Sequence, residues 1–212
     1  MHRQRDWRAL GGDYRELEPA GKLLLIDSFL APAVATPLAE ALRGGLDWAQ
    51  RPIMMFGREV LQPRLTAFHG DPNVAYTYSG KTMKAVPWTE DLAALRDHIS
   101  EFSGQAFNSV LCNFYRDGQD SMGWHADNEP ELGLNPLIAS LSFGARRRFQ
   151  LKSRLGSQRL ELELGHGSLL LMGGDCQHHW LHQLPKTRRP LAWRLNLTFR
   201  TVVPHRPDRR PR

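Results

Sequence analysis

The second half of the chain is a series of short apolar runs separated by turn residues, and this pattern constrains the fold more than any other feature. The clearest runs are SVLCNFY, LIASLSF, RRFQL, RLELEL, SLLLM and AWRLNLTF. Runs of this length that alternate apolar and polar positions are typical of strands with one face in a core. No helical periodicity interrupts them, so we predict a β sandwich, jelly roll or barrel for residues 105–203.

The first half predicts two helices. The first is expected to begin with Thr36 as its N-cap and Pro37 in its first turn, and to end at Gly44. The second is expected over residues 89–103, where apolar side chains recur at helical spacing, with Gly104 ending it. Together with the β half, these helices predict a mainly β fold with flanking helices, an α+β arrangement.

Short strands complete the first half. One is expected at residues 23–26, before the first helix. The segments IMMFGREVLQPRLTAFHG and AYTYSG are expected to form further strands, with tight turns at residues 57–58 and 71–73, where Gly and Asn favour turns.

We expect a single domain with an extension at each end. Residues 1–21 are polar and interrupted by Gly and Pro, which predicts a loosely docked arm. Residues 22–203 are expected to form the domain, with a helix-supported part (22–104) followed by the β core (105–203). Residues 204–212 (PHRPDRRPR) are basic and rich in Pro, which predicts a disordered tail.

The chain is basic, with a formal net charge of +6 and 28 Lys and Arg residues, all but five of them Arg. Guanidinium groups pair with phosphate in a planar fork, so this surface charge favours a nucleic-acid partner. The alternative is a basic surface that is only solvated. Charge alone does not decide between the two.

Several features predict a cytoplasmic protein. Cys112 and Cys176 are the only cysteines and form no CxxC pair, as expected for reduced thiols in a reducing compartment. The longest apolar runs are too short to cross a bilayer. The N-terminus carries charge but no apolar signal segment. We therefore expect no membrane partner, and a monomer by default.

The β half also carries residues in the order that a mononuclear iron site needs. His125 and Asp127 lie two apart in WHADNE, and residues two apart in a strand point to the same face. Two imidazoles and one carboxylate form the facial triad of non-haem Fe(II) oxygenases. The second imidazole would come from another strand, and spacing alone leaves four histidines open: His166, His178, His179 and His182. For each of them the alternative is an ordinary surface or core histidine.

Arg194 and Arg200 follow in RLNLTFR. An oxygenase of this kind needs a clamp for a dicarboxylate cosubstrate, and two guanidinium groups supply one. The alternative is a pair of surface arginines on an edge strand, which their mostly apolar or neutral neighbours make less favourable.

Residues 62–203 resemble the AlkB family of Fe(II)/2-oxoglutarate dioxygenases, which repair N-alkylated bases of nucleic acids. The motifs that carry the resemblance are QPRLTAFHG, YTYSG, LCNFYRDGQDSMGWHADNE, PLIASLSFGARRRF, LGHGSLLLM, HWLHQLP and RLNLTFR, in the order of the family. They are most similar to the branch that contains the animal duplex-DNA repair enzymes. The resemblance implies a double-stranded β-helix (jelly-roll) core, with Fe(II) as cofactor and 2-oxoglutarate and O2 as cosubstrates.

The resemblance also implies a set of site residues. The implied iron ligands are His125, Asp127 and His182, which leaves the other three histidines as ordinary residues. The implied 2-oxoglutarate-binding residues are Asn113, Tyr115, Arg194, Asn196 and Arg200.

The implied reaction is oxidative demethylation of 1-methyladenine and 3-methylcytosine in single- or double-stranded DNA, releasing formaldehyde, succinate and CO2. A base in a duplex must be flipped out to reach a buried metal, and an aromatic ring can stack on it. The resemblance assigns this stacking to Tyr78, opposite the ring of His125. It also implies that Tyr76 and Glu129 contact the substrate. Phe56, at a hairpin tip, would insert into the gap that the flipped base leaves in the duplex.

These substrate residues have plain alternatives: Tyr76 and Tyr78 as core residues, and the hairpin folded back on the body. Asn128 stands where the duplex-repair relatives carry an acid, which leaves the base preference open. The residues that we expect to contact phosphate are Arg146, Arg147, Arg148, Lys186, Arg188 and Arg189.

Two rival functions remain. One is a 2-oxoglutarate oxygenase that acts on RNA or on a substrate other than nucleic acid. Net charge, Tyr78 and the Phe56 hairpin argue against a non-nucleic substrate but do not separate DNA from RNA. The other is a non-catalytic β-barrel that binds metal or nucleic acid, which has no need for the complete set of ligands and arginines.

Overall fold

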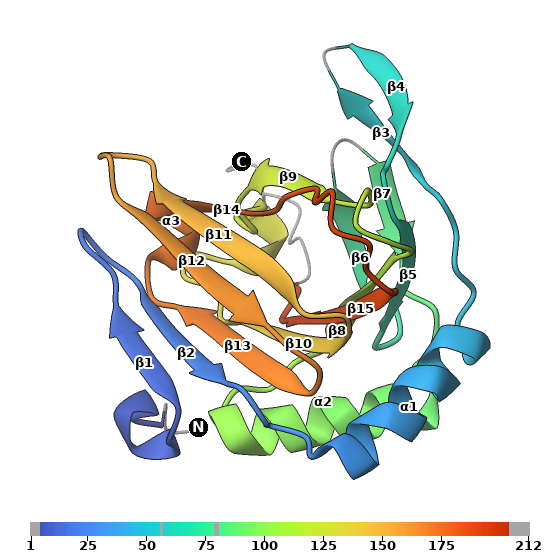
Figure 1. The fold of residues 1–212 in the computed structure, drawn as a ribbon, viewed down its shortest axis with the longest axis horizontal. Coiled ribbons are helices and arrows are strands. Elements are labelled where there is room, and N and C mark those ends of the chain that lie inside the picture. The colour runs from blue at the N-terminus through green and yellow to red at the C-terminus, as the bar shows by residue number, and fades with distance from the viewer. Residues whose placement is uncertain (1–4, 56, 79–80, 204–212) are drawn as a thin grey trace, which may run out of the picture.

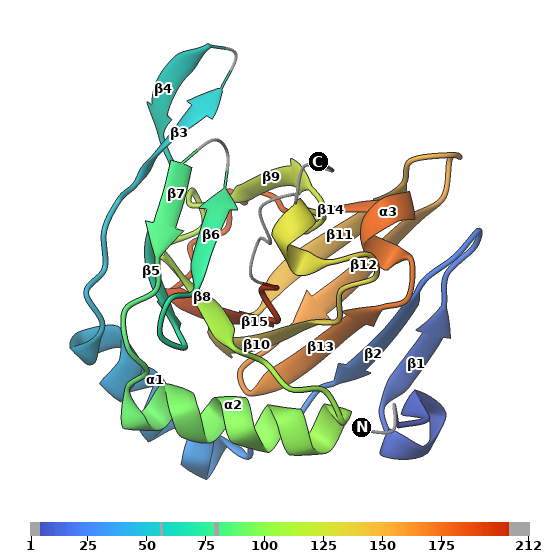
Figure 2. The same cartoon turned by 180° about the vertical axis from the view of Figure 1, so that it is seen from behind.

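The structure, a computed structural model, describes residues 5–55, 57–78 and 81–203. Two antiparallel β sheets face each other, and two helices lie along the outer face of the larger sheet (Figure 1). A hairpin of residues 52–55 and 58–61 projects at the end opposite the helices, and a second hairpin, residues 75–78 and 81–84, lies beside residues 65–70 at the edge of the larger sheet, as both views show (Figure 2). This arrangement confirms the prediction of a mainly β fold with flanking helices.

The larger sheet has seven strands in the order β1-β2-β13-β10-β15-β8-β5. Its strands are β1 (Asp13–Glu16), β2 (Lys22–Ile26), β5 (Leu65–Gly70), β8 (Ser109–Tyr115), β10 (Ile138–Gly144), β13 (Ser168–Gly173) and β15 (Arg194–Arg200). The smaller sheet has four strands in the order β12-β11-β14-β9. Its strands are β9 (Met122–His125), β11 (Arg147–Ser153), β12 (Arg159–Leu164) and β14 (Trp180–Leu184).

The second long helix follows its sequence signals. Helix α2 (Glu90–Ser103) begins after Thr89, whose hydroxyl accepts a hydrogen bond from the amide of Leu92 at 3.3 Å. It ends at Gly104, which has a φ of 73°. A left-handed residue at this position favours glycine, because other side chains clash with the backbone there. The predicted helix is confirmed at both ends.

The first long helix, α1 (Pro32–Gly45), begins five residues before Pro37, its predicted first residue. Two prolines compete for the first turn, and Pro32 takes that position, so Pro37 lies inside the helix and removes one hydrogen bond. The Thr36 hydroxyl, predicted as a cap, lies 3.1 Å from the ring Nε2 of His166 instead. Three shorter elements are α3 (Cys176–His179) and the 3-10 helices η1 (Trp7–Leu10) and η2 (Pro130–Leu132).

The larger sheet is covered on both faces, and alternation along its strands divides the core in two. On β15, Leu195, Leu197 and Phe199 belong to the cluster that contacts the helices. The intervening residues Arg194, Asn196, Thr198 and Arg200 therefore face the smaller sheet. A polar stripe in the middle of the molecule follows from this pattern.

The N-terminal segment is more firmly attached than predicted. Strand β1 pairs with β2 and forms an edge of the larger sheet. Trp7 is only 2% exposed and packs in the core on the helix side. The expectation of a loosely docked arm is therefore wrong for the described part of residues 1–21, because an apolar indole and a sheet edge dock it.

The two hairpins are β3 (Pro52–Met55) with β4 (Arg58–Leu61), and β6 (Ala75–Tyr78) with β7 (Lys81–Lys84). Phe56 and the predicted tail, residues 204–212, lie outside the described residues. Both cysteines are free and buried, and burial raises the pKa of their thiols. No helix in the described ranges is long and apolar enough to span a bilayer.

Candidate metal centre and cosubstrate site

Three predicted ligands meet between the two sheets. His125 ends β9 and lies directly opposite His182 of β14 in the strand pairing. Asp127 lies beyond the end of β9, so strand alternation does not orient it, yet its carboxylate still reaches both rings. Asp127 Oδ1 lies 3.9 Å from His125 Nε2, and Oδ2 lies 4.0 Å from His182 Nε2. All three donor atoms lie within 4.8 Å of one another, the one such cluster in the described part of the chain.

Both imidazoles are held in the form that binds a metal. The Nδ1–H of His125 donates to the Gly123 carbonyl at 2.9 Å, because a carbonyl can only accept, and this leaves the Nε2 lone pair toward Asp127. Burial, together with the neighbouring His125, lowers the pKa of His182 to about 3. Burial also lowers the pKa of His125. At neutral pH both rings are uncharged.

Asp127 is ionised in this site. Its side chain is buried, which by itself raises the pKa, but the charge of Arg200, the two neighbouring histidines and the hydrogen bond from Arg200 together outweigh this, and the net pKa lies below the usual value. Arg200 Nη2 donates to Asp127 Oδ1 at 2.7 Å. One carboxylate and two neutral imidazoles therefore face a common point, which is the donor set that suits Fe(II) with open positions.

The cluster lines a cavity with about 520 Å³ of space between atoms, part of it open to solvent. The polar stripe of β15 forms one wall, and β8 and β10 continue it on either side. The predicted cosubstrate residues all border this cavity: Asn113, Tyr115, Arg194, Asn196 and Arg200.

Arg194 is a buried cation without a carboxylate partner among the described residues. It is 2% exposed, its Nη2 donates to Ser142 Oγ at 2.9 Å, and its guanidinium lies 5.3 Å from the ring centre of Tyr115. Its Nε has no hydrogen-bond partner in the described ranges. Burial lowers its pKa to about 10, so it stays charged at neutral pH. Because an uncompensated buried charge is costly, this wall favours an anionic ligand.

The two asparagines are fixed by neighbouring polar groups. Asn196 donates to Ser140 Oγ at 2.8 Å and accepts from Thr198 Oγ1 at 3.0 Å. Asn113 Oδ1 accepts from Arg64 Nε at 2.7 Å. Arg64, itself 2% exposed and a lining residue of the cavity, was not singled out from the sequence. A single arginine before a strand carries no local signal of burial.

The histidines set aside by the resemblance lie elsewhere. His166 Nδ1 accepts a hydrogen bond from the Gly144 amide at 3.0 Å. His178 is exposed and contacts the Leu134 carbonyl, and His179 is half-buried on α3. None of the three joins the cluster of donor atoms.

The predicted substrate residues are placed only in part. Tyr76 and Tyr78 belong to β6, but their side chains lie outside what the structure describes, as does all of Phe56. Glu129 is half-buried, two residues after Asp127, and Asn128 is exposed.

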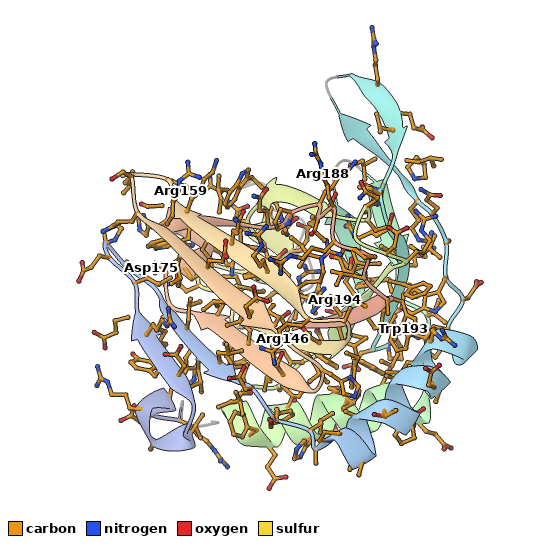
Figure 3. All side chains as sticks on the ribbon, in the orientation of Figure 1. Arg146, Arg159, Asp175, Arg188, Trp193 and Arg194 are labelled. Carbon is orange, nitrogen blue, oxygen red and sulfur yellow. The ribbon has the colours of Figure 1, made fainter. Side chains whose placement is uncertain are left out.

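Arg147 is not a surface residue, so its prediction as a phosphate contact is wrong. It is 3% exposed, and it donates to the backbone carbonyls of Asp117, Asp120 and Pro185 at 3.1, 3.0 and 2.7 Å. Strand alternation turns it into the core between two exposed neighbours. The other predicted phosphate contacts are exposed: Arg146, Arg148, Lys186, Arg188 and Arg189, of which Arg188 lies at the periphery in Figure 3.

Two facing antiparallel sheets that hold a two-histidine, one-carboxylate cluster beside a buried arginine define the class of jelly-roll Fe(II) oxygenases. Comparison with known proteins agrees. The family model described as 2OG-Fe(II) oxygenase superfamily matches residues 22–200. The solved structure of OsALKBH1 shares the fold, with a TM-score of 0.56 at 18% identity over 89% of this chain and 100% of that one. The predicted jelly-roll core is confirmed.

Two relatives narrow the class. Alpha-ketoglutarate-dependent dioxygenase alkB homolog 3 of Rattus norvegicus is 42% identical over 200 residues, 89% of this chain and 67% of the relative. DNA oxidative demethylase ALKBH2 of Bos taurus is 45% identical over 160 residues, 72% of this chain and 58% of the relative. The chain belongs to the AlkB family of 2-oxoglutarate- and Fe(II)-dependent dioxygenases. The expectations of an enzyme, and of Fe(II), 2-oxoglutarate and O2, are confirmed with it.

Proposed function

We propose that this dioxygenase removes methyl groups oxidatively from N-alkylated DNA bases, including 1-methyladenine and 3-methylcytosine. The observation that carries the proposal is the buried cluster of His125, Asp127 and His182, which shares one cavity with Arg194. The similarity to a relative named DNA oxidative demethylase supports DNA as the substrate.

In this proposal the cluster holds the metal. Fe(II), once bound with 2-oxoglutarate and O2, supplies the oxidant that hydroxylates the N-methyl group, with succinate and CO2 as coproducts. The hydroxymethyl group is then lost as formaldehyde, which restores the base. The chain keeps both imidazoles neutral by burial and keeps Asp127 ionised through Arg200.

We assign the cosubstrate to the polar wall of the cavity. Arg194, buried without a carboxylate partner in the described ranges, would pair with one carboxylate of 2-oxoglutarate, beside Tyr115 and Asn113. Arg200 borders the same cavity and would face the other carboxylate while it holds Asp127. Asn196 would complete the wall between the two arginines.

Substrate recognition is assigned to residues 22–104 and to the loop after the metal ligands. Tyr78 and the ring of His125 would stack on the flipped base, and Tyr76 and Glu129 would contact the substrate. Phe56 would fill the gap in the duplex. One surface groove is lined by Arg146, Arg148, Lys186 and Arg189. Arg188 lies on the loop that carries Lys186 and Arg189, and all five side chains would contact the phosphate backbone.

The test measures formaldehyde release and base restoration with purified protein, Fe(II), 2-oxoglutarate and ascorbate. Single-stranded DNA, duplex DNA and matched RNA would each carry either methylated base, with Asp127→Ala as the control. Turnover on DNA that disappears in the variant supports the proposal. Succinate without base restoration would keep the oxygenase and reject the demethylase, and preference for RNA would move the function to the rival substrate.

A further inference from the structure

Gln177 is a fully buried side chain outside the ligand set, and it is bonded to the metal loop. It lies on α3 and is 0% exposed. Its Oε1 accepts a hydrogen bond from the backbone N–H of Asp127 at 3.0 Å, across 50 residues of sequence. Its Nε2 lies 3.9 Å from the sulfur of Met172, a weak acceptor, which suits this orientation of the amide.

This bond matters because Asp127 has left the sheet. Strand β9 ends at His125, so the amide of Asp127 has no ladder partner, and among the described residues its hydrogen bond goes to Gln177. The carboxylate of the same residue is held separately by Arg200. Backbone and side chain of Asp127 are therefore anchored by two different residues.

The helix that carries Gln177 is connected directly to the strand of another ligand. Helix α3 runs directly into β14 at Trp180, and β14 carries His182. A single side chain thus ties the loop of one ligand to the element of another. A shift of this loop would change the distance between Asp127 and His182 without altering either ligand.

We propose that Gln177 is a positioning residue of the metal centre, which fixes Asp127 relative to His182 through the Asp127 amide. The proposal rests on the assignment of these residues as metal ligands. Residues that orient ligands from outside the metal shell change metal affinity by about 10- to 100-fold when they are replaced. If Gln177 only fills space, its replacement would lower the stability of the protein and leave its metal affinity unchanged.

The test is a titration of the metal-free protein with Co(II), followed by its visible absorption, on the wild type, Gln177→Leu and Gln177→Asn. Leucine removes the acceptor, and asparagine keeps an amide that is too short to reach. We expect about tenfold weaker Co(II) binding and a changed absorption band in both variants. Asparagine also keeps the test valid if the leucine variant does not fold.

His69→Leu is the matched control. His69 is buried, and its Nδ1 donates to the Pro87 carbonyl at 2.8 Å, on the helix side of the larger sheet. Its loss removes one comparable hydrogen bond far from the cluster, so we expect lower thermal stability with Co(II) affinity within twofold of the wild type. Unchanged Co(II) affinity in both Gln177 variants, or an equal loss in His69→Leu, would overturn the proposal. A wild type that binds no Co(II) would overturn the proposed function itself.

Discussion

The central strands of the larger sheet and the hairpin of β3 and β4 are built in opposite ways. Strand β15 is paired on both sides and covered on both faces, and all seven of its residues are buried. Strand β4 pairs only with β3, and all four of its residues are exposed. Polar groups on β15 are held in one place by the ladder, whereas the hairpin keeps its surface available for a large partner. The fold thus separates a buried wall, to which we assign the chemistry, from an exposed hairpin, to which we assign contact with DNA.

The largest expected effect comes from the metal loop. Asp127→Ala should abolish formaldehyde release and also lower the free energy of unfolding by roughly 3–5 kcal/mol, because Arg200 loses its buried carboxylate. Asp127→Asn should abolish release too, with a smaller loss of stability, since its amide oxygen can still accept from Arg200. Urea unfolding of both variants separates the two effects. Equal stability of both variants and the wild type would contradict the buried ion pair.

Two buried arginines sharpen the comparison within the sheets. Arg194→Met should raise the KM for 2-oxoglutarate roughly 100-fold, about 3 kcal/mol. It should leave the thermal stability of the cosubstrate-free protein unchanged or higher, because it removes a buried charge without a carboxylate partner.

Arg147→Met is the matched variant for this prediction. Arg147 is equally buried but satisfies three backbone carbonyls, so its loss should lower stability by about 1–3 kcal/mol or more. Melting curves with and without 2-oxoglutarate make the test. Similar curves for the two variants would show that burial alone sets the effect on stability and that the lack of an anionic partner does not distinguish Arg194 from Arg147.

Changes on the hairpin of β3 and β4 should affect DNA binding and leave stability and 2-oxoglutarate binding nearly unchanged. Val60 and Leu61 are 43% and 57% exposed, so Val60→Ser with Leu61→Ser should change stability by no more than about 0.5 kcal/mol. We expect the KM for methylated duplex DNA to rise severalfold, with the KM for 2-oxoglutarate unchanged. Steady-state kinetics with each substrate varied in turn gives both values. A rise in the 2-oxoglutarate KM would mean that the two regions are not separate.

A pH-dependent effect on stability is expected in the link between the sheets, where Asp120 follows β8. Burial raises its pKa, but two side-chain hydrogen bonds and one backbone bond from Arg116 outweigh this, so the pKa lies below its usual value. The resulting stability is present above the unfolded pKa, near 3.9, and is lost as the pH falls through the lower folded value. In urea unfolding, the free energy of unfolding of the wild type should exceed that of Asp120→Asn by about 1.5 kcal/mol at pH 7 and by less at pH 3. A difference that grows on acidification would have the wrong sign.

Local signals predicted the elements whose ends are set by neighbouring residues. Helix α2 was placed correctly because Thr89 and Gly104 act within one turn of its ends. Helix α1 was misplaced because two prolines compete, and local rules do not rank them. Arg147 and Arg194 both lie in strands, and the sequence does not show which one meets carbonyls and which one faces a cavity. Gln177 and Arg64 carried no signal, because their partners lie 50 and 49 residues away.

By itself, the sequence determined the strand pattern, the polar stripe of RLNLTFR and the close pair of His125 and Asp127. These depend on alternation and spacing within one segment. Only the tertiary structure decided that His182 lies opposite His125, that Arg200 holds Asp127, and that Gln177 anchors its amide. Such contacts join residues 50 or more positions apart, and they exist only once two sheets have paired and packed face to face.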